Sequence, residues 1–287
     1  MNVMNNVTEV RDLSFEDFCH YVEQRMKSVH SEVSLREVQK NNGCKRKALT
    51  VKAVCAPCMY LDGYYECYKV EGMSYTLDKI MLDFDDAITQ GEEYKEIVFL
   101  PWSEIKDCII FQLVNYERNS EWLKSVPHKR MLDLAIVFRY LIDSDERGMA
   151  STVITDSFSQ KLGVTTEELY EVACKNTPNL LPYTLGDIGD ILGLGDVGAN
   201  FMWCLTNDKM VNGAACMLYN GVLESIRERF GTNLVIIPSS IHEVLILPVE
   251  YEKEMNDMVQ EVNKTVLSAE DILADHIYVY DGELKCV

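Results

Sequence analysis

Residues 201–249 read FMWCLTNDKMVNGAACMLYNGVLESIRERFGTNLVIIPSSIHEVLILPV, and this stretch decides the fold. Apolar runs of strand length alternate with one segment whose apolar residues recur at helical spacing and which ends at a glycine, Gly231. The stretch predicts the following elements in order: strand 201–206, helix 212–230, strand 233–237 and strand 242–249.

The flanking sequence extends this pattern into a domain. A helix is predicted at 251–264 and a strand at 276–281, which completes the β-α-β-β-α-β order of ferredoxin-like sheets. Upstream, LDLAIVFRYLI and ASTVIT read as adjacent antiparallel strands, and TTEELYEVACKNT reads as a helix capped by Thr165 or Thr166. We therefore predict a C-terminal α+β domain over residues 127–287, with an antiparallel or mixed sheet and helices packed on it.

The preceding residues, 1–126, predict an N-terminal α+β region. Ser14 caps an amphipathic helix, and two strands join at Asn41-Asn42-Gly43, a strong hairpin turn. Two more helices, at 60–68 and 75–88, and a strand within CIIFQLVNY complete the region.

Composition indicates an ordinary globular protein. The chain has 287 residues, of which 47% are hydrophobic and 25% charged. It contains neither an apolar run long enough to cross a bilayer nor a secretory signal at its start. Ten cysteines without an export signal read as reduced thiols, so we expect a cytoplasmic protein that does not bind membranes.

The charge is unevenly distributed. Residues 1–56 carry a net charge of +2 and residues 57–287 carry −21, which together give the net charge of −19. This balance argues against direct binding of DNA or RNA, which depends on Lys and Arg. It leaves open an acidic inhibitor that imitates nucleic acid and binds a basic protein; an ordinary solvated surface explains the same charge.

Polar side chains gather where the predicted elements of the opening stretch meet. Side chains at element ends are well placed to meet a partner, so these residues form our predicted binding rim: Asn207, Asn212, Ser239, Ser240, His242 and Glu243.

Cysteines offer two other chemistries in the N-terminal region. Cys55-Ala56-Pro57-Cys58 lies between a strand-like and a helix-like segment, where a redox pair of the thioredoxin type would sit. With Cys44 and Cys67 the pair supplies four thiols, although the spacing is poor for a zinc site. Buried or incidental thiols explain the same residues.

Catalytic alternatives remain in the C-terminal half. Cys216, at the start of a predicted helix, and His242, on a strand, could form a cysteine-hydrolase pair, but Glu243 would point to the opposite face and could not orient the imidazole. Ser239 and Ser240 lack the sequence of a nucleophile elbow. Gly193, Gly195 and Gly198 match the spacing GxGxxG without the strand and helix that a dinucleotide site needs.

Several segments carry a resemblance to a known family: HKRMLDLAIVFRYLI, GMASTVITDSF, TTEELYEVACKNTP, NGAACMLYNGVLESI, IIPSSIHEVLILP and VNKTVLSAEDILADHIYVY. Together with VQKNNG and PCMYLDGYYECY, they make nearly the whole chain similar to domain of unknown function 5688, a bacterial family common in gut Firmicutes. The resemblance implies that the PCMYLDGYY block starts a helix. It also implies that Cys55, Cys58 and Cys67 are additions to the family pattern, which weakens the redox and zinc interpretations.

These observations lead to one preferred interpretation and two alternatives. We expect a non-enzymatic protein-binding or regulatory module that needs no cofactor and whose partner protein is unknown. The alternatives are a cysteine-dependent hydrolase or thiol-redox enzyme, and the acidic nucleic-acid mimic.

Overall fold

The computed structural model describes residues 13–51, 58–93, 100–145, 148–191 and 202–287. The chain forms two compact units: unit 1 comprises residues 1–40 and 44–99, and unit 2 comprises residues 41–43 and 100–287. Both units combine helices with antiparallel strands, so the predicted α+β class is confirmed.

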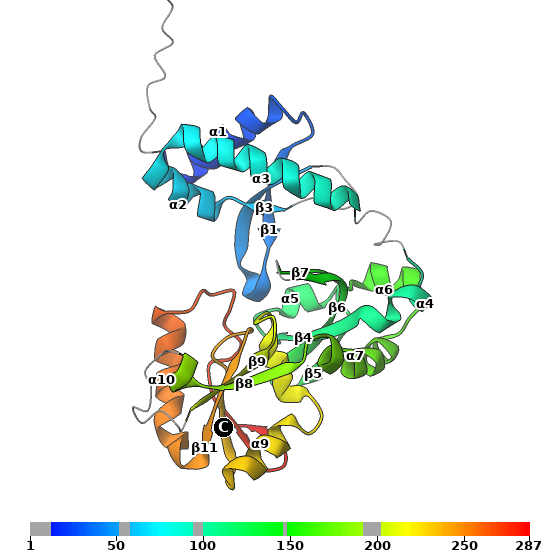
Figure 1. The fold of residues 1–287 in the computed structure, drawn as a ribbon, viewed down its shortest axis with the longest axis vertical. Helices are drawn as coiled ribbons and strands as arrows, with labels where there is room; N and C mark the ends of the chain where they lie inside the picture. The colour runs from blue at the N-terminus through cyan, green and yellow to red at the C-terminus, as the bar shows by residue number, and fades with distance from the viewer. Residues whose placement is uncertain (1–12, 52–57, 94–99, 146–147, 192–201) are drawn as a thin grey trace, which may run out of the picture. The chain divides into compact units, whose positions relative to one another are not determined.

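Unit 1 packs helices on a small antiparallel sheet (Figure 1). Its elements are α1 (Phe15–Lys27), β1 (Ser34–Gln39), β2 (Lys45–Thr50), β3 (Met59–Tyr60), α2 (Asp62–Glu71) and α3 (Met73–Glu93). The Ser14 hydroxyl accepts a hydrogen bond from the Asp17 N–H, as the predicted cap requires. The predicted hairpin is also present, since β1 and β2 pair across a turn in which Asn42 has a φ of 58°. Phe18, Leu49 and Phe84 lie fully buried at the centre of the core.

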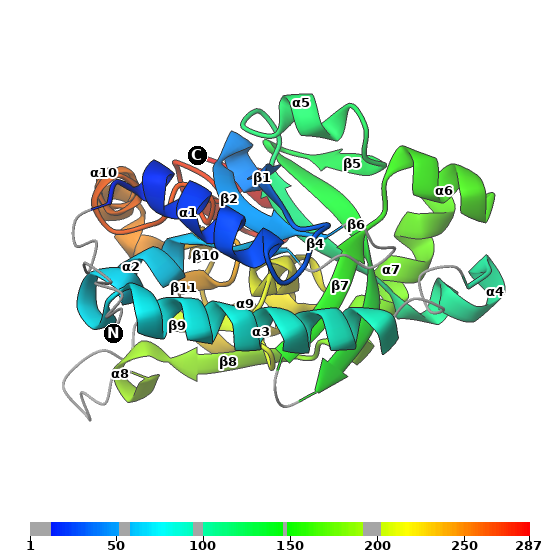
Figure 2. The ribbon, with the colours of Figure 1, turned by 90° about the horizontal axis from the view of Figure 1, so that it is seen from above.

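The first sheet of unit 2 is built around one long strand. Its strands are β4 (Ile109–Asn115), β5 (His128–Met131), β6 (Leu134–Asp145) and β7 (Gly148–Val153). β4 pairs along one edge of β6, while β5 and then β7 pair along the other (Figure 2). The short helix α4 (Trp102–Ile105) precedes β4, and α5 (Ser120–Leu123) connects β4 to β5. After β7 come α6 (Asp156–Leu162) and α7 (Thr166–Leu180), and α7 packs on β4. Because β4 pairs with β6, the boundary predicted between residues 126 and 127 falls inside unit 2.

The second sheet of unit 2 has the strand order β13-β12-β10-β11-β9-β8. Its elements are β8 (Tyr183–Asp187), α8 (Ile188–Ile191), β9 (Trp203–Asn207), the 3₁₀ segment η4 (Gly213–Leu218), α9 (Val222–Phe230), β10 (Leu234–Ile237), β11 (Val244–Pro248), α10 (Glu252–Thr265), β12 (Tyr278–Tyr280) and β13 (Leu284–Cys286). All four residues of β10 are buried, because α10 covers one face of the sheet and η4 with α9 covers the other.

Two details of this sheet differ from expectation. The elements from β9 to β12 follow the predicted β-α-β-β-α-β order along the chain, but a ferredoxin-like sheet is not confirmed. In a ferredoxin-like sheet the last strand, here β12, would pair with the first, β9. Instead β12 pairs with β10, and β8 pairs with the free edge of β9. The single helix predicted at 212–230 is wrong. Gly221, with a φ of 77°, separates η4 from α9 because a left-handed residue interrupts a right-handed helix.

No helix among the described residues is both long enough and apolar enough to cross a membrane.

Candidate functional site

The residues of the predicted binding rim come together in unit 2. They lie on two loops, one following β9 and one preceding β11, and these strands are antiparallel neighbours, so both loops meet at the same end of the sheet. The Thr206 hydroxyl donates a 2.7 Å hydrogen bond to the carbonyl oxygen of His242 and joins the two loops. The predicted gathering of these side chains is therefore present, and their role in binding stays a prediction.

Asn207 organises the first loop. Its side chain is buried, with 1% exposure. The amide nitrogen donates to the carbonyl oxygen of Val211 at 2.8 Å, and the amide oxygen accepts from the backbone N–H groups of Lys209 and Val211 at 3.1 and 3.3 Å. All three hydrogen bonds join the Asn207 side chain to the backbone of its own loop. Asn207 therefore fixes the conformation of this loop and does not itself face a partner.

His242 has partners at both ring nitrogens. Nδ1 accepts a 3.2 Å hydrogen bond from the backbone N–H of Asn212, and Nε2 lies 3.5 Å from a carboxylate oxygen of Asp271. Nδ1 acts as an acceptor, so the proton of a neutral ring is on Nε2 and points to Asp271. The acid that orients His242 is thus Asp271, which sequence reasoning missed; Glu243 does not fill this role, as expected.

Glu243 instead stabilises the second loop. One of its carboxylate oxygens accepts from the hydroxyls of Ser239 and Ser240 at 3.0 and 2.9 Å. The Ser240 oxygen also accepts from the His242 N–H at 2.9 Å. The two serines therefore satisfy groups of the turn, which is a structural use of their hydroxyls.

Cys216 lies in η4 and is fully buried. Burial raises the pKa of its thiol to about 12, so the reactive thiolate is scarce at neutral pH. His242, its proposed partner, directs Nδ1 to Asn212 and Nε2 to Asp271. The hydrolase pair is therefore not assembled around Cys216.

The other thiol chemistries receive no support from the described residues. Cys55 lies outside them, as do Gly193, Gly195 and Gly198. Cys58 is exposed, whereas Cys44 and Cys67 are partly buried. Within the described part of the chain, Cys44, Cys58 and Cys67 do not belong to a group of three donors at metal-binding distance.

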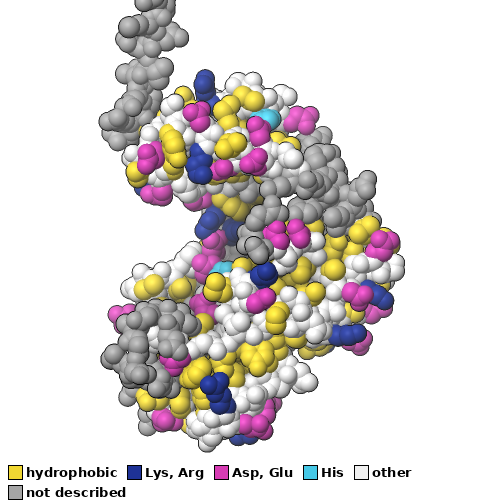
Figure 3. All heavy atoms as spheres, viewed as in Figure 1, with side chains coloured by type: hydrophobic (Ala, Val, Ile, Leu, Met, Phe, Trp, Pro, Cys, Tyr) yellow, Lys and Arg dark blue, Asp and Glu magenta, His cyan; other side chains and the backbone are white. Residues whose placement is uncertain are grey.

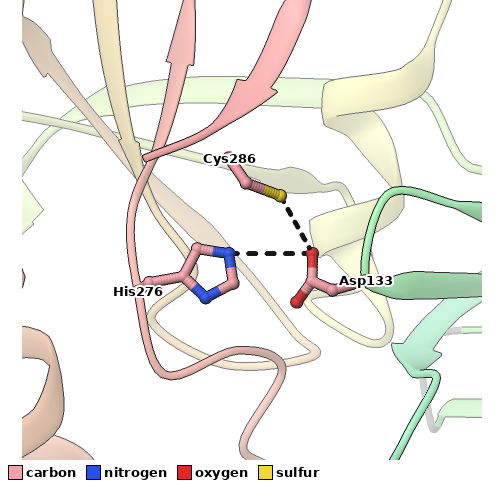
Figure 4. A group of neighbouring side chains, drawn as sticks. All are labelled: Asp133, His276 and Cys286. Carbon is pink, nitrogen blue, oxygen red and sulfur yellow. Dashed lines mark hydrogen bonds and ion pairs between the residues drawn. The ribbon is translucent and has the colours of Figure 1, made fainter.

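A different cluster, unforeseen from the sequence, brings three donor types together in unit 2. It consists of Asp133, His276 and Cys286, whose donor atoms all lie within 4.8 Å of one another (Figure 4). Oδ1 of Asp133 is the shared neighbour, 3.4 Å from Sγ of Cys286 and 3.7 Å from Nε2 of His276. Nε2 of His276 is buried and has no hydrogen-bond partner.

Strand pairing fixes the side chains that face Asp133. Tyr278 on β12 lies opposite Cys286 on β13, and its hydroxyl donates a 2.9 Å hydrogen bond to Oδ1 of Asp133. His276 lies two residues before Tyr278, and its ring packs edge-on against the Tyr278 ring with the centroids 5.0 Å apart. The hydroxyl of Tyr278 therefore reaches the same carboxylate oxygen that His276 and Cys286 approach.

The turn between β5 and β6 fixes Asp133 itself. Leu132 has a left-handed φ of 56°, which is unusual for a residue other than glycine. The carbonyl oxygen of Leu132 accepts from Nε of Arg130 at 3.0 Å, and the carbonyl oxygen of Asp133 accepts from the N–H of Tyr116 at 2.9 Å. The carboxylate is thus presented from a fixed backbone.

Comparison with known proteins places nearly the whole chain in one family model. The model described as "Family of unknown function (DUF5688)" matches residues 15–282. No curated protein matches the chain. No solved structure matches it either.

Proposed function

This chain belongs to DUF5688, a family of unknown function, and we propose that it is a non-enzymatic module that binds a partner protein through the rim at residues 207–212 and 239–243. One observation carries the proposal. The candidate base, His242, has both ring nitrogens engaged, and the candidate nucleophile, Cys216, is buried with a raised pKa. The hydrogen bonds of Thr206, Asn207 and Glu243 instead hold the two loops of the rim in place.

An apolar anchor on this rim supports protein binding. Met210 is 72% exposed and has a φ of 53°, so the loop clamped by Asn207 displays a flexible apolar side chain. Tyr183, 45% exposed, lies on β8 opposite Asn207 in the strand register. Apolar and aromatic anchors beside partly exposed polar groups are typical of protein interfaces, and methionine adapts well to a partner surface.

Site-specific photo-crosslinking tests the proposal. A benzophenone amino acid replaces Met210 in one variant and Val266, which is 74% exposed at the end of α10 in the same unit, in the matched control. We expect a discrete protein adduct from position 210 in cells of the source organism, and none of the same mass from position 266. Identical adducts from both positions, or adducts from neither, contradict the proposal.

The proposal places the protein in the cytoplasm. All the described cysteines are free thiols, which supports a reducing compartment. The acidic-mimic alternative receives less support. On the face drawn in Figure 3, the described Asp and Glu side chains are scattered among basic and apolar ones, whereas a nucleic-acid mimic needs a regular acidic track.

A further inference from the structure

We propose that Asp133, His276 and Cys286 bind a divalent transition-metal ion of the zinc type. The three donors come from separate parts of unit 2: the turn between β5 and β6, the residues before β12, and β13. This site is independent of the rim at residues 207–212 and 239–243, and either proposal can fail without the other.

The donor spacing matches a tetrahedral zinc site. Zinc bonds of about 2.3 Å to sulfur and about 2.0 Å to nitrogen or oxygen place neighbouring ligand atoms about 3.5 Å apart for sulfur and oxygen, and about 3.3 Å apart for nitrogen and oxygen. The corresponding distances are 3.4 Å between Cys286 and Asp133 and 3.7 Å between His276 and Asp133. Sγ of Cys286 and Nε2 of His276 lie within 4.8 Å of each other, and movement of these two side chains toward a shared ion would complete the geometry.

The environment of His276 points to a missing ligand. Its Nε2 atom is buried and lacks a hydrogen-bond partner, while the nearest carboxylate oxygen, on Asp133, is 3.7 Å away. Buried polar atoms in folded proteins are nearly always satisfied, and an unsatisfied one calls for an explanation. A metal ion bound between Nε2 of His276 and Oδ1 of Asp133 gives Nε2 the partner that it lacks.

The chemistry of the donors selects the ion. A thiolate, an imidazole and a carboxylate suit zinc, whereas calcium and magnesium prefer oxygen ligands alone. On binding, the thiol of Cys286 releases its proton to solvent, and the thiolate and carboxylate then balance the two charges of the ion. Cys286 is exposed, so water completes a fourth position.

Tyr278 supports the site from behind. Its side chain is fully buried, and its hydroxyl holds Oδ1 of Asp133 at 2.9 Å. Hydrogen bonds of this kind orient metal ligands, and their loss costs about ten- to a hundredfold in metal affinity. Tyr278 would therefore hold the Asp133 carboxylate in the orientation that metal binding needs.

Cobalt(II) titration of the purified full chain, stripped with a chelator, tests the assignment. Cobalt replaces zinc in such sites and gives a thiolate charge-transfer band in the near ultraviolet. We expect one equivalent to produce this band, and zinc to displace it. Cys286→Ser should abolish the band, and His276→Ala or Asp133→Asn should weaken binding at least about tenfold. Cys174→Ser, which removes an exposed thiol on α7, is the matched control and should leave the titration unchanged.

Two further measurements keep the test decisive if a ligand variant folds poorly. Circular dichroism and thermal unfolding report the fold of each variant. X-ray absorption of the zinc-loaded wild-type protein should show one sulfur with nitrogen and oxygen neighbours. The proposal is overturned if the wild-type protein gives no thiolate band, if the band survives in Cys286→Ser, or if the zinc shell contains no sulfur or several sulfurs.

Discussion

Gly213 packs directly against Thr206: a β-carbon on the glycine would lie 2.1 Å from the threonine hydroxyl oxygen. The same β-carbon would lie 2.5 Å from the carbonyl oxygen of His242 and 2.7 Å from the backbone nitrogen of Asn207. Two of these three atoms belong to the backbone and cannot rotate away. The start of η4 therefore fits between the two loops of the rim only because residue 213 has no side chain.

Gly213→Ala should lower the free energy of unfolding by about 1–3 kcal/mol or more, because the added methyl group overpacks a site bounded by backbone. Urea unfolding measures the change. Gly63→Ala is the matched control: its added β-carbon meets no atom within 4 Å, and the residue lies in α2, where alanine is favoured over glycine. We expect the control to be neutral or stabilising. Equal losses in both variants would contradict the packing argument.

Asn207→Ala should also destabilise the protein, by about 1–3 kcal/mol, because it leaves backbone groups of Lys209 and Val211 without partners. Asn179→Ala removes a single exposed hydrogen bond on α7 and should stay within about 0.5 kcal/mol of the wild type. If the loop carries the binding anchor, Asn207→Ala should also reduce crosslinking from position 210. Unchanged crosslinking in a folded Asn207→Ala variant would show that partner binding does not depend on the hydrogen bonds of Asn207.

Cys216 should resist alkylation in the folded protein. It is fully buried and its pKa is raised to about 12, so neither access nor thiolate formation favours reaction at neutral pH. Iodoacetamide treatment followed by peptide mass mapping should show modification of the exposed Cys58 and Cys174 first, and of Cys216 only after denaturation. Modification of native Cys216 as fast as Cys174 would restore the cysteine-enzyme alternative.

Local signals predicted much of this fold. The caps at Ser14 and Thr165 and the turn at Asn41–Gly43 all depend on residues close together in the chain, and the structure has each of them. The break at Gly221 was also signalled locally, by the dipeptide Asn220-Gly221, but the helical spacing on either side outweighed it.

Long-range pairing explains most of what the sequence concealed. The residues of β8 lie in a stretch rich in glycine and aspartate, in which local spacing predicts no strand. They form a strand because they pair with β9. The acid beside His242 is Asp271, which no spacing rule connects to it. The cluster of Asp133, His276 and Cys286 likewise depends on which strands become neighbours, so no short motif could have revealed it.

The capping box of α7 predicts a specific pH dependence. The carboxylate of Glu168 accepts 2.8 Å hydrogen bonds from the backbone N–H and the hydroxyl of Thr165, and these bonds hold the pKa of Glu168 below its usual range. A depressed pKa in the folded state means that the stabilisation is fully present above about pH 4.3, the ordinary glutamate pKa, and is lost as the pH falls through the folded value.

Glu168→Gln isolates the part of this stabilisation that depends on charge, because glutamine can still accept the hydrogen bonds but is neutral. We expect the variant to be less stable than the wild type at neutral pH. The difference should shrink as the pH falls below the folded pKa of Glu168, where the wild-type side chain becomes neutral too. Urea unfolding of both proteins across this pH range measures the gap. A gap that stays constant, or widens in acid, would show that the charge of Glu168 does not stabilise the helix start.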